Sequence, residues 1–440
     1  MARVLIAGGG LAGLAAAAAL SSADHDITIL EARPYLGGRA TSYPVPSGET
    51  EEIIDNCQHI LLKCCVNLMD FYRRLGVDNA IHFHREFFFI EPGGRTSTMK
   101  AGLLPAPLHF TESFAGLRFL SLGDKIAIGR ALLALRRERT HRTDLDRITM
   151  LDWLREKKQT PHAIERFWQQ VLVSAINEDL DRMAALHGFQ VFYLGFLAAS
   201  DSYEMGIPAG RLGDLYSAEA WKHLPNVQIR MRTPIARIMV TDDRVEGLQT
   251  ADGSLQADHY ISALPFERLP AVLPESDLPF DEFAHSPITG IHLWFDRPVT
   301  NLPHGTLLDR TIQWFFNKDA GRYLQLVVSA SRSLVPMGRA EIIELALREL
   351  KEFLPGAGAA QLVKAHVVKE VRATFSARPG LEATRPEPST RWPNLSLAGD
   401  WTRSGWPATM EGAVRSGYLA AESACLALGR PRQFLLPDIA

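Results

Sequence analysis

Thirteen residues near the start of the chain, DNCQHILLKCCVN at 55–67, concentrate side chains that can do chemistry. Asp55 and His59 can gain or lose a proton, whereas Asn56 and Gln58 only donate and accept hydrogen bonds. Groups of these kinds, when positioned, assist the departure of a poor leaving group or bind a polar part of a substrate. The stretch therefore predicts proton transfer or the recognition of a polar group.

The cysteines of this stretch raise the alternative of a metal site. Structural zinc takes cysteine and histidine ligands in spaced pairs. Cys64 and Cys65 are adjacent, and neither they nor Cys57 with His59 form such a pair. We therefore predict no metal ion here and interpret the cysteines as small packing residues.

A second group of residues predicts a dinucleotide site at the N-terminus. Gly8, Gly10 and Gly13 stand in G-x-G-x-x-G spacing between a buried strand at 4–7 and a helix of small residues. In that motif the first glycine makes a tight turn, the second lets the backbone approach a pyrophosphate, and the third lets the helix pack on the strand. Glu31 ends the next strand, at the distance where an acid that binds a ribose belongs.

Length and composition limit the classes of protein to consider. A chain of 440 residues is too long for one compact core and should divide into lobes. A net charge of −3 gives no general attraction to nucleic acid, and no nucleic-acid motif is present. Four cysteines cannot form a disulfide framework, which favours a cytoplasmic location. The apolar N-terminus is explained better by strand, turn and helix than by a secretion signal, and no apolar run is long enough to span a bilayer.

The continuation of the glycine motif resembles the flavoproteins of the amine oxidase and phytoene desaturase superfamily. EARPYLGGRA places Gly38 and Arg39 in E-x6-G-R spacing after Glu31. In that superfamily the backbone and the arginine hold the pyrophosphate of FAD, and a guanidinium group binds phosphate oxygens well. A surface turn with a solvated arginine is the alternative interpretation.

Near the C-terminus, NLSLAGDWTRSGWPATMEGAVRSGYLAA resembles the segment that returns to the FAD domain in the same superfamily. The resemblance implies that Asp400 binds the ribityl chain, that the helix opening at 410–413 points its N-terminus at the flavin ring, and that Ile235 borders the adenine. We therefore expect FAD as the cofactor. The residues expected to contact it are Gly8, Gly10, Leu11, Ala12, Gly13, Glu31, Ala32, Arg33, Gly38, Arg39, Ile235, Gly399, Asp400, Met410, Glu411, Gly412 and Ala413.

The same resemblance implies an α/β fold, with a Rossmann-like FAD-binding domain and a discontinuous α+β substrate domain. Helical periodicity between the FAD segments agrees with an inserted helical lobe. The expected segments are an FAD-binding domain in three parts at 1–70, 211–270 and 391–440, a largely helical substrate lobe at 71–210 and a substrate-domain sheet at 271–390.

Three stretches together resemble the bacterial hydroxysqualene dehydroxylase family, formerly described as squalene-associated FAD-dependent desaturases. They are DNCQHILLKCCVNLMDFYRRLG, LLPAPLHF with FLSLGDKIAIGRALLAL, and SGWPATMEGAVRSG. The resemblance implies reductive loss of an allylic hydroxyl from hydroxysqualene, giving squalene for squalene and hopanoid biosynthesis. A carotenoid-type desaturase and an amine oxidase are alternatives within the superfamily. A flavin-free prenyl-lipid carrier is an alternative of another class, against which the intact glycine motif, Arg39 and Asp400 argue.

On this interpretation, Asp55, Asn56, Gln58 and His59 form a polar patch in an apolar cavity. His59 or Asp55 would be the acid that protonates the departing hydroxyl. The alternative is that these residues cap a turn and brace the flavin loop.

Two tryptophans flank the C-terminal flavin segment. Trp401 and Trp406 either line the cavity for a hydrophobic isoprenoid substrate, where aromatic faces would steady a carbocation, or pack in the core. The sequence predicts no particular oligomeric state.

The apolar segment LLPAPLHFTESFAGLRFLSL begins at Leu103, and the helix after it ends in the basic run RRERTHR at 136–142. One interpretation is a core helix with a solvated basic end. The other is a lipid-facing entrance whose basic residues lie near anionic headgroups. Peripheral contact with the inner face of a membrane is therefore a further prediction.

Overall fold

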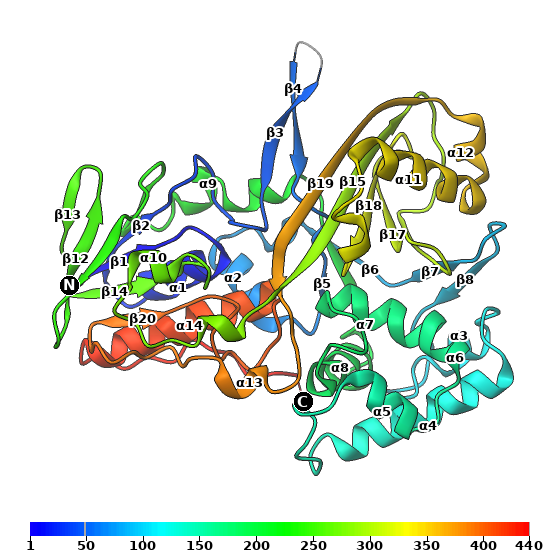
Figure 1. Ribbon diagram of the computed structural model, residues 1–440, viewed down its shortest axis with the longest axis horizontal. Coiled ribbons are helices and arrows are strands. Elements are labelled where there is room, and N and C mark those ends of the chain that lie inside the picture. The colour runs from blue at the N-terminus through cyan, green and yellow to red at the C-terminus, as the bar shows by residue number, and fades with distance from the viewer. Residues whose placement is uncertain (48–49, 440) are drawn as a thin grey trace.

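The computed structural model describes residues 1–47 and 50–439. It consists of a lobe built on a five-stranded sheet and a second lobe that combines a seven-stranded sheet with a group of helices (Figure 1). Within the described residues no helix is both long and apolar enough to cross a membrane.

The five-stranded sheet is parallel and is assembled from three distant parts of the chain. Its strand order is β10-β2-β1-β14-β20. Its central strands are buried along most of their length, as expected where helices or loops cover both faces. The strands are β1 (Arg3–Ala7), β2 (Asp26–Leu30), β10 (Val227–Arg230), β14 (His259–Ser262) and β20 (Leu395–Leu397).

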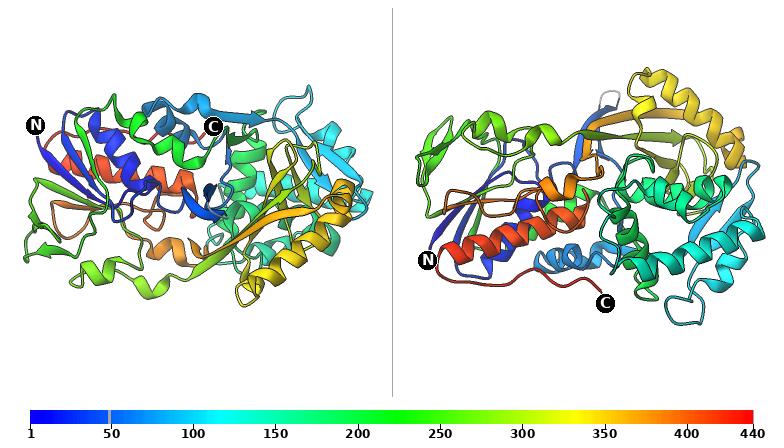
Figure 2. Two further views of the ribbon diagram at one scale, coloured as in Figure 1. Left: turned by 90° about the horizontal axis from the view of Figure 1, so that it is seen from above. Right: turned by 60° about the horizontal axis from the view of Figure 1, so that its bottom comes forward.

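Helices α1 (Leu11–Ser21) and α14 (Met410–Ala427) pack against each other beside this sheet, although they lie near opposite ends of the chain. Figures 1 and 2 show α14 in red next to α1 in dark blue. The helices approach closely because α1 is mostly alanine and because α14 has Gly417 at the contact. A Cβ atom at Gly417 would lie 2.2 Å from the carbonyl oxygen of Ala12.

The seven-stranded sheet has the order β19-β15-β18-β17-β16-β7-β8. Alternate residues of its strands face α11 (Arg339–Phe353), where Leu326 and Phe315 contribute to a closed apolar core. The opposite face of the sheet lies towards the other helices of the second lobe. The strands are β7 (Phe87–Ile90), β8 (Thr96–Met99), β15 (His285–Phe295), β16 (His304–Leu307), β17 (Trp314–Asp319), β18 (Tyr323–Ser329) and β19 (Leu362–Phe375).

The helical part of the second lobe buries a cluster of aromatic rings that includes Trp153, Trp168 and Phe192. Its helices are α3 (Thr111–Ala115), α4 (Leu122–Glu138), α5 (Met150–Glu156), α6 (Pro161–Ala163), α7 (Gln169–Ile176) and α8 (Ala185–Phe192), with the π-helical turns η2 (Ile164–Trp168) and η3 (Tyr193–Leu197).

Small sheets and short helices connect these units. The strands are β3 (Ser42–Ser47), β4 (Thr50–Asp55), β5 (Leu61–Leu62), β6 (Ile81–His84), β9 (Met205–Pro208), β11 (Arg237–Val240), β12 (Val245–Thr250) and β13 (Gly253–Leu255). The helices are α2 (Val66–Arg74), α9 (Ala218–Trp221), α10 (Leu269–Val272), α12 (Pro355–Ala359) and α13 (Leu381–Thr384).

One expected boundary differs from the structure. β7 and β8 fall within 71–210, which was predicted to be largely helical, yet both strands belong to the seven-stranded sheet. β7 pairs in parallel with β16, more than 200 residues further along the chain. Local periodicity cannot indicate such a partner, because strand pairing is decided by tertiary contacts.

The close approach of α1 and α14 gives a test of stability. Gly417→Ala should lower the free energy of unfolding by about 1–3 kcal/mol, because the new methyl group meets backbone that cannot move aside. Gly129→Ala in the middle of α4 is the matched control, since nothing lies within 4 Å of its Cβ position. That change should be neutral or should stabilise by about 0.5–1 kcal/mol. Equal unfolding midpoints for the two variants in denaturant would contradict this account of the contact.

Candidate active site

The glycine turn after β1 forms a cradle of exposed backbone. Gly8 has a φ of +111°, and a Cβ at Gly13 would lie 2.0 Å from the carbonyl oxygen of Gly8. These two glycines therefore allow the turn and the packing of the helix on the strand. Gly10 differs, because its Cβ position meets only the Cα of Gly38, at 3.9 Å. The second glycine of the motif thus borders open space, as a pyrophosphate site requires.

Glu31 fastens this turn to the end of β2. One carboxylate oxygen accepts from the N–H of Gly9 and the other from the N–H of Arg33, both at 2.7 Å. The carbonyl of Glu31 accepts from the N–H of Thr233, which brings half-buried Ile235 towards the same end of the sheet. Ala32 and Arg33 are exposed beside Glu31. The N-terminal and middle segments predicted to bind the nucleotide are therefore close together.

Arg39 and Asp400 lie in direct contact although they are far apart in sequence. Nη2 of Arg39 lies 2.6 Å from Oδ1 of Asp400, and Nη1 donates to the carbonyl of Ala373. Arg39 was predicted as a pyrophosphate ligand and Asp400 as a ribityl ligand. In the structure the two predicted ligands are joined to each other, so they close one site from opposite ends of the chain.

Buried Arg385 holds the loop that carries Asp400. Its guanidinium donates to the carbonyls of Asp400 and Trp406 at 2.9 and 2.7 Å, and also to the carbonyl of Thr402. A buried charge is tolerated when most of its donors are satisfied, as those on Nη1 and Nη2 are here, and Glu382 supplies a counterion, while Nε has no partner among the described residues. Sequence analysis missed Arg385, because no motif surrounds it and its partners are backbone atoms.

The N-terminus of α14 opens next to this loop. The hydroxyl of Thr409 accepts from the N–H of Gly412 at 3.0 Å and caps the helix. Met410 and Ala413 occupy the first turn, which carries the positive end of the helix dipole. The residues predicted from the C-terminal motif therefore lie at a helix end suited to an electron-rich ring.

The side chain of Glu411, at the same helix end, is buried and strongly hydrogen-bonded. Its carboxylate accepts from the side-chain amide of Asn67 at 2.9 Å and from the N–H of Leu68 at 2.7 Å, while Arg415 lies 3.8 Å away. Burial raises the pKa of Glu411 to about 7, although these hydrogen bonds oppose the shift. The charge at the helix end therefore changes near neutral pH.

A large apolar cavity adjoins the N-terminus of α14. It encloses about 1090 Å³, counting the open space at its mouth. Met410, Glu411 and Trp406 form one end of it, and Phe87 and Trp314 of the seven-stranded sheet form a wall. Apolar side chains dominate the lining, which suits a ligand made mainly of hydrocarbon.

The predicted polar patch at 55–59 does not line this cavity. Among the described residues, the lining of this region begins at Ile60. Asp55 and Gln58 instead meet Lys318 of β17, whose Nζ lies 3.3 Å from Oδ2 of Asp55 and 3.1 Å from Oε1 of Gln58. Asp55 and Gln58 therefore lie outside the lining of this cavity, and their predicted contact with a substrate stays a prediction. A buried carboxylate needs a countercharge and donors, and the sheet supplies them.

Further hydrogen bonds hold this stretch to the flavin side. The other oxygen of Asp55 accepts from the hydroxyl of Ser42 and the N–H of Leu212, and the amide of Asn56 donates to the carbonyl of Arg39. These bonds are those of a brace, which was the alternative interpretation of Asp55 and Asn56.

His59 is held by its own backbone. Nδ1 lies 2.9 Å from the carbonyl oxygen of Cys57, and because a carbonyl only accepts, Nδ1 carries the proton. Burial lowers the pKa of His59, although the hydrogen bond to Cys57 opposes this. The imidazole is therefore neutral at pH 7, with Nε2 as an acceptor. Asp55 and His59 share no hydrogen bond among the described residues.

The two predicted tryptophans have different positions. Trp406 lines the cavity. Trp401 is not among the residues that line it, and its surroundings are those of the core-packing alternative. The Trp401 ring is 1% exposed, it meets Phe283 edge-on at 6.0 Å, and its N–H donates to the carbonyl of Leu264. Packing in the core leaves Trp401 no free face for a ligand.

Beside the cavity wall, on the same face of the seven-stranded sheet as Trp314, a row of buried polar side chains crosses the strands. His304, Gln325 and His292 occupy one register row with Phe316. Both ring nitrogens of His304 and both amide atoms of Gln325 are buried and have no hydrogen-bond partner among the described residues. Such groups are costly unless water or a ligand satisfies them. The row is invisible in the sequence, because the four residues lie on four strands.

Within residues 1–47 and 50–439, no group of three or more histidine, cysteine, aspartate or glutamate side chains is placed to hold a metal ion. The four cysteines are free thiols, and Cys57, Cys64 and Cys425 are buried.

The parallel sheet, the glycine cradle and the helix end at Met410 define a dinucleotide-binding oxidoreductase. Comparison with known proteins agrees: the flavin-containing amine oxidoreductase family matches residues 11–425. The chain belongs to that family, and its cofactor is FAD. Gly10, Gly38 and the first turns of α1 and α14 are the residues that fit FAD, since they offer open backbone and helix N-termini. The predicted fold class and cofactor are confirmed.

Curated relatives cover nearly the whole chain. A 15-cis-phytoene desaturase of Synechococcus elongatus is 26% identical over 463 residues, covering 96% of this chain and 95% of its own. A probable zeta-carotene desaturase of the same organism is 26% identical over 475 residues, covering 96% and 98%. Among solved structures, a variant of putrescine oxidase has a TM-score of 0.73 at 15% identity, covering 97% and 99%. Cyclohexylamine oxidase of Brevibacterium oxydans has 0.69 at 17%, covering 98% and 100%. These structures establish the shared fold.

The open space at Gly10 gives a test of the cofactor site. Gly10→Leu should abolish retention of FAD, because its side chain would occupy the space beside Gly38 that the pyrophosphate requires. The ratio of flavin absorbance to protein after gel filtration measures retention. Gly358→Leu, at an exposed position with nothing within 4 Å of its Cβ, should keep its flavin. A folded Gly10→Leu protein with stoichiometric flavin would show that the nucleotide lies elsewhere.

The raised pKa of Glu411 predicts a pH dependence of stability. The folded protein holds this proton more tightly than the unfolded chain, so the stabilisation is complete below about pH 4.5 and is lost as pH rises through about 7. Glu411→Gln cannot lose a proton, so its melting temperature relative to the wild type should increase between pH 5 and pH 8. Exposed Glu246→Gln is the control and should follow the wild type. Parallel curves for all three holoproteins would refute the assignment.

Proposed function

We propose that this protein is an FAD-dependent oxidoreductase whose substrate is a long isoprenoid hydrocarbon. The observation that carries the proposal is the cavity, whose walls are aromatic and aliphatic and which ends at the first turn of α14. Each methylene-sized unit transferred there from water contributes roughly 0.8 kcal/mol. A thirty-carbon chain therefore needs few polar contacts to bind.

FAD supplies hydride transfer in either direction, so the same cavity suits two reactions. The residues of this chain orient the substrate, exclude water and control a proton. Phe87, Trp314 and Trp406 give the cavity its aromatic faces. Such faces favour polyenes and positively charged carbon over neutral saturated chains.

Removal of hydrogen, as in a carotenoid-type desaturase, is the reaction that the curated relatives support better. Their printed activities are phytoene and zeta-carotene desaturation. A desaturase can use a group that accepts a proton from the substrate. The neutral imidazole of His59 has an acceptor at Nε2 and is consistent with that role. At 26% identity, however, the relatives support the superfamily more firmly than the substrate.

Reductive dehydroxylation of hydroxysqualene is the second candidate, and the D-N-x-Q-H stretch favours it. In that reaction the allylic C–O bond would break, a proton would join the departing oxygen to give water, and the new C–H bond would need a hydride, which is the chemistry that reduced FAD would supply. The buried polar row beside Trp314 offers hydrogen-bonding atoms that have no partner among the described residues. These groups support a role in stabilising a leaving oxygen.

The direction of the flavin colour change distinguishes the two reactions. Under anaerobic conditions, photoreduced enzyme mixed with hydroxysqualene should regain its yellow colour and form squalene if it is a dehydroxylase. Oxidised enzyme mixed with phytoene should lose its colour and form a desaturated product if it is a desaturase. A response to putrescine or cyclohexylamine, and to neither isoprenoid, would overturn the proposal in favour of amine oxidation.

The role of His59 is tested separately from that of its neighbours. If His59 takes part in proton transfer, His59→Ala should keep flavin and melting temperature while turnover of the accepted isoprenoid falls by about 10²–10⁴. Exposed His223→Ala should behave as the wild type. Asp55→Asn should instead lower the melting temperature, because Lys318 loses its buried counterion. Normal turnover in His59→Ala with bound flavin would remove His59 from the mechanism.

A further inference from the structure

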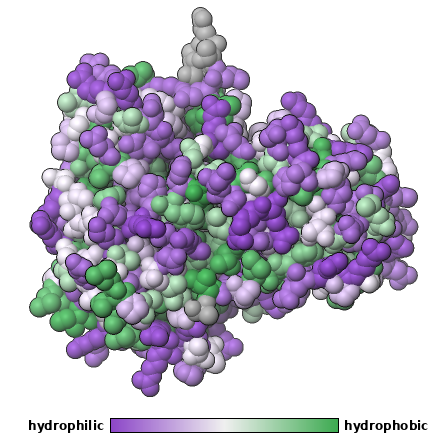
Figure 3. Space-filling view, turned by 180° about the vertical axis from the view of Figure 1, so that it is seen from behind, coloured by the Kyte–Doolittle hydropathy of each residue, from purple (hydrophilic) through white to green (hydrophobic). Residues whose placement is uncertain are grey.

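Large apolar side chains are exposed together at one end of the helical lobe. We call this the apical surface, formed by the loop at 103–108 and one face of α4. Leu103 is fully exposed, and Leu122 and Leu133 are 75% and 66% exposed. Leu104, Leu108 and Ile126 complete the set. Figure 3 shows hydrophobic side chains gathered at the corner where α3 and the start of α4 lie.

The face of α4 in this surface has the pattern of an interfacial helix. At about 100° per residue, Leu122, Ile126 and Leu133 fall within a stripe about 40° wide. Basic residues flank the stripe on both sides: Lys125 and Arg136 on one, Arg130 and Arg137 on the other. The three arginines are exposed and have no ion-pair partner among the described residues. An apolar stripe with a basic border is the arrangement that favours an anionic lipid surface.

Rigid packing fixes the orientation of this stripe. The opposite face of α4 is buried through Ile128, Ala131 and Leu135. At its N-terminus, buried Asp124 closes a capping box with Ser121 and accepts from His162 at 2.8 Å. The apolar side chains therefore cannot turn inwards, because the helix is already anchored by its other side.

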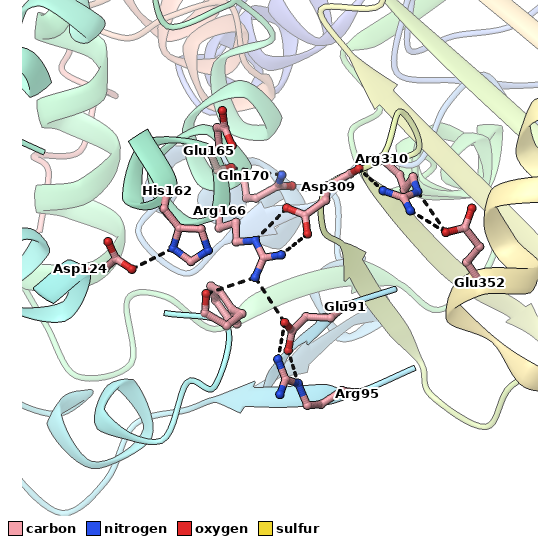
Figure 4. Close-up of polar contacts among 11 residues, drawn as sticks. Glu91, Arg95, Asp124, His162, Glu165, Arg166, Gln170, Asp309, Arg310 and Glu352 are labelled. Carbon is pink, nitrogen blue, oxygen red and sulfur yellow. Dashed lines mark hydrogen bonds and ion pairs between the residues drawn. The ribbon is translucent and has the colours of Figure 1, made fainter. Parts of the chain in front are cut away.

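A network of ion pairs ties the same region to the seven-stranded sheet. Figure 4 shows Arg166 pointing between Asp309 and Glu91, with Arg95 completing the chain of contacts and the Asp124–His162 pair nearby. Arg166 also donates to the carbonyl of Phe119, just before α4. The apical surface is thus part of a rigid unit that includes the cavity wall.

The apical surface also adjoins the cavity. Phe110 follows the exposed loop and its ring lies 6.1 Å from that of Phe196, which lines the cavity. Met99 lines the cavity from the strand just before the loop. Only one layer of aromatic rings therefore separates the exposed leucines from the interior.

We infer that the apical surface docks on a membrane surface containing anionic lipids. Charge favours lipid over a second copy of the chain, because a symmetric pair would bring the two arginine borders together. The inference does not depend on which redox reaction the enzyme performs. It explains why these leucines are exposed, since no part of the chain that the structure describes covers them.

The structure revises the sequence prediction for this region. Leu117, Phe119 and Leu120 of the apolar segment are core residues, so only its first part reaches the surface. In the basic run, Arg142 is held by Asp144 and Glu156, and Arg139 stacks on Tyr193 at 3.5 Å. The cations available to headgroups are instead Arg130, Arg136 and Arg137, because Lys125 donates to the carbonyl of Ala115.

Vesicle flotation of the full-length holoenzyme tests the inference. Vesicles of phosphatidylcholine with a third of the lipid replaced by phosphatidylglycerol should carry the wild-type protein at low salt, and added salt should weaken binding. The triple variant Leu122→Ser, Ile126→Ser, Leu133→Ser should lose binding to these vesicles. The variant Arg130→Gln, Arg137→Gln should bind them about five-fold more weakly for each charge removed, with binding to pure phosphatidylcholine unchanged.

The matched control replaces three exposed apolar residues elsewhere, Val363, Val371 and Leu426, with serine. It should float like the wild type. All variants should keep their flavin, because none touches the cofactor site. Undiminished flotation of the α4 triple variant would overturn the inference. So would a wild-type dimer in light scattering without lipid that the same variant converts to monomer, since the surface would then serve a second copy.

Discussion

The contact of Arg39 and Arg385 with Asp400 is the constraint on which the rest of the structure depends. Asp400 reaches Arg39 through its carboxylate and Arg385 through its carbonyl. One contact joins the loop to the N-terminal segment, and the other fixes the shape of the loop before α14. The cofactor site exists only when these distant segments meet, so the folding of the chain and the assembly of the site are the same event.

The two lobes that meet near this contact differ in the chemical groups that they offer. The FAD side offers mainly backbone: open glycine turns and the first turns of α1 and α14, which suit phosphate and an electron-rich ring, with Arg39 and Asp400 beside them. The substrate side is built from apolar side chains on a rigid sheet. An apolar wall strengthens every electrostatic interaction near it. Burial raises the pKa of Glu411 and lowers the pKa of His59. Both shifts favour the uncharged form of the side chain.

The difference between the two lobes also explains the positions of the polar side chains at 55–59. A carboxylate cannot stay ionised against hydrocarbon without a partner, and Asp55 obtains one by turning away from the cavity to Lys318. The stretch links the flavin side to the sheet, so its polar residues hold the two lobes in register while the following residues, from Ile60, form the apolar lining. Residues 55–59 and the cavity-lining residues that follow from Ile60 therefore belong to one continuous segment of backbone.

The sequence by itself determined the features that depend on local spacing. Gly8, Gly10, Gly13 and the acid at Glu31 act through neighbouring backbone, so their positions along the chain were enough to predict a dinucleotide site. FAD and the role of the helix that opens at Met410 came from the resemblance to a flavoprotein superfamily. The tertiary structure alone decided what depends on residues brought together from different elements. Lys318 against Asp55, Arg385 under the flavin loop and the polar row of His292, Gln325 and His304 are such cases. It also decided which leucines of 103–133 are core and which are surface, because burial depends on what packs against a helix and not on the helix alone.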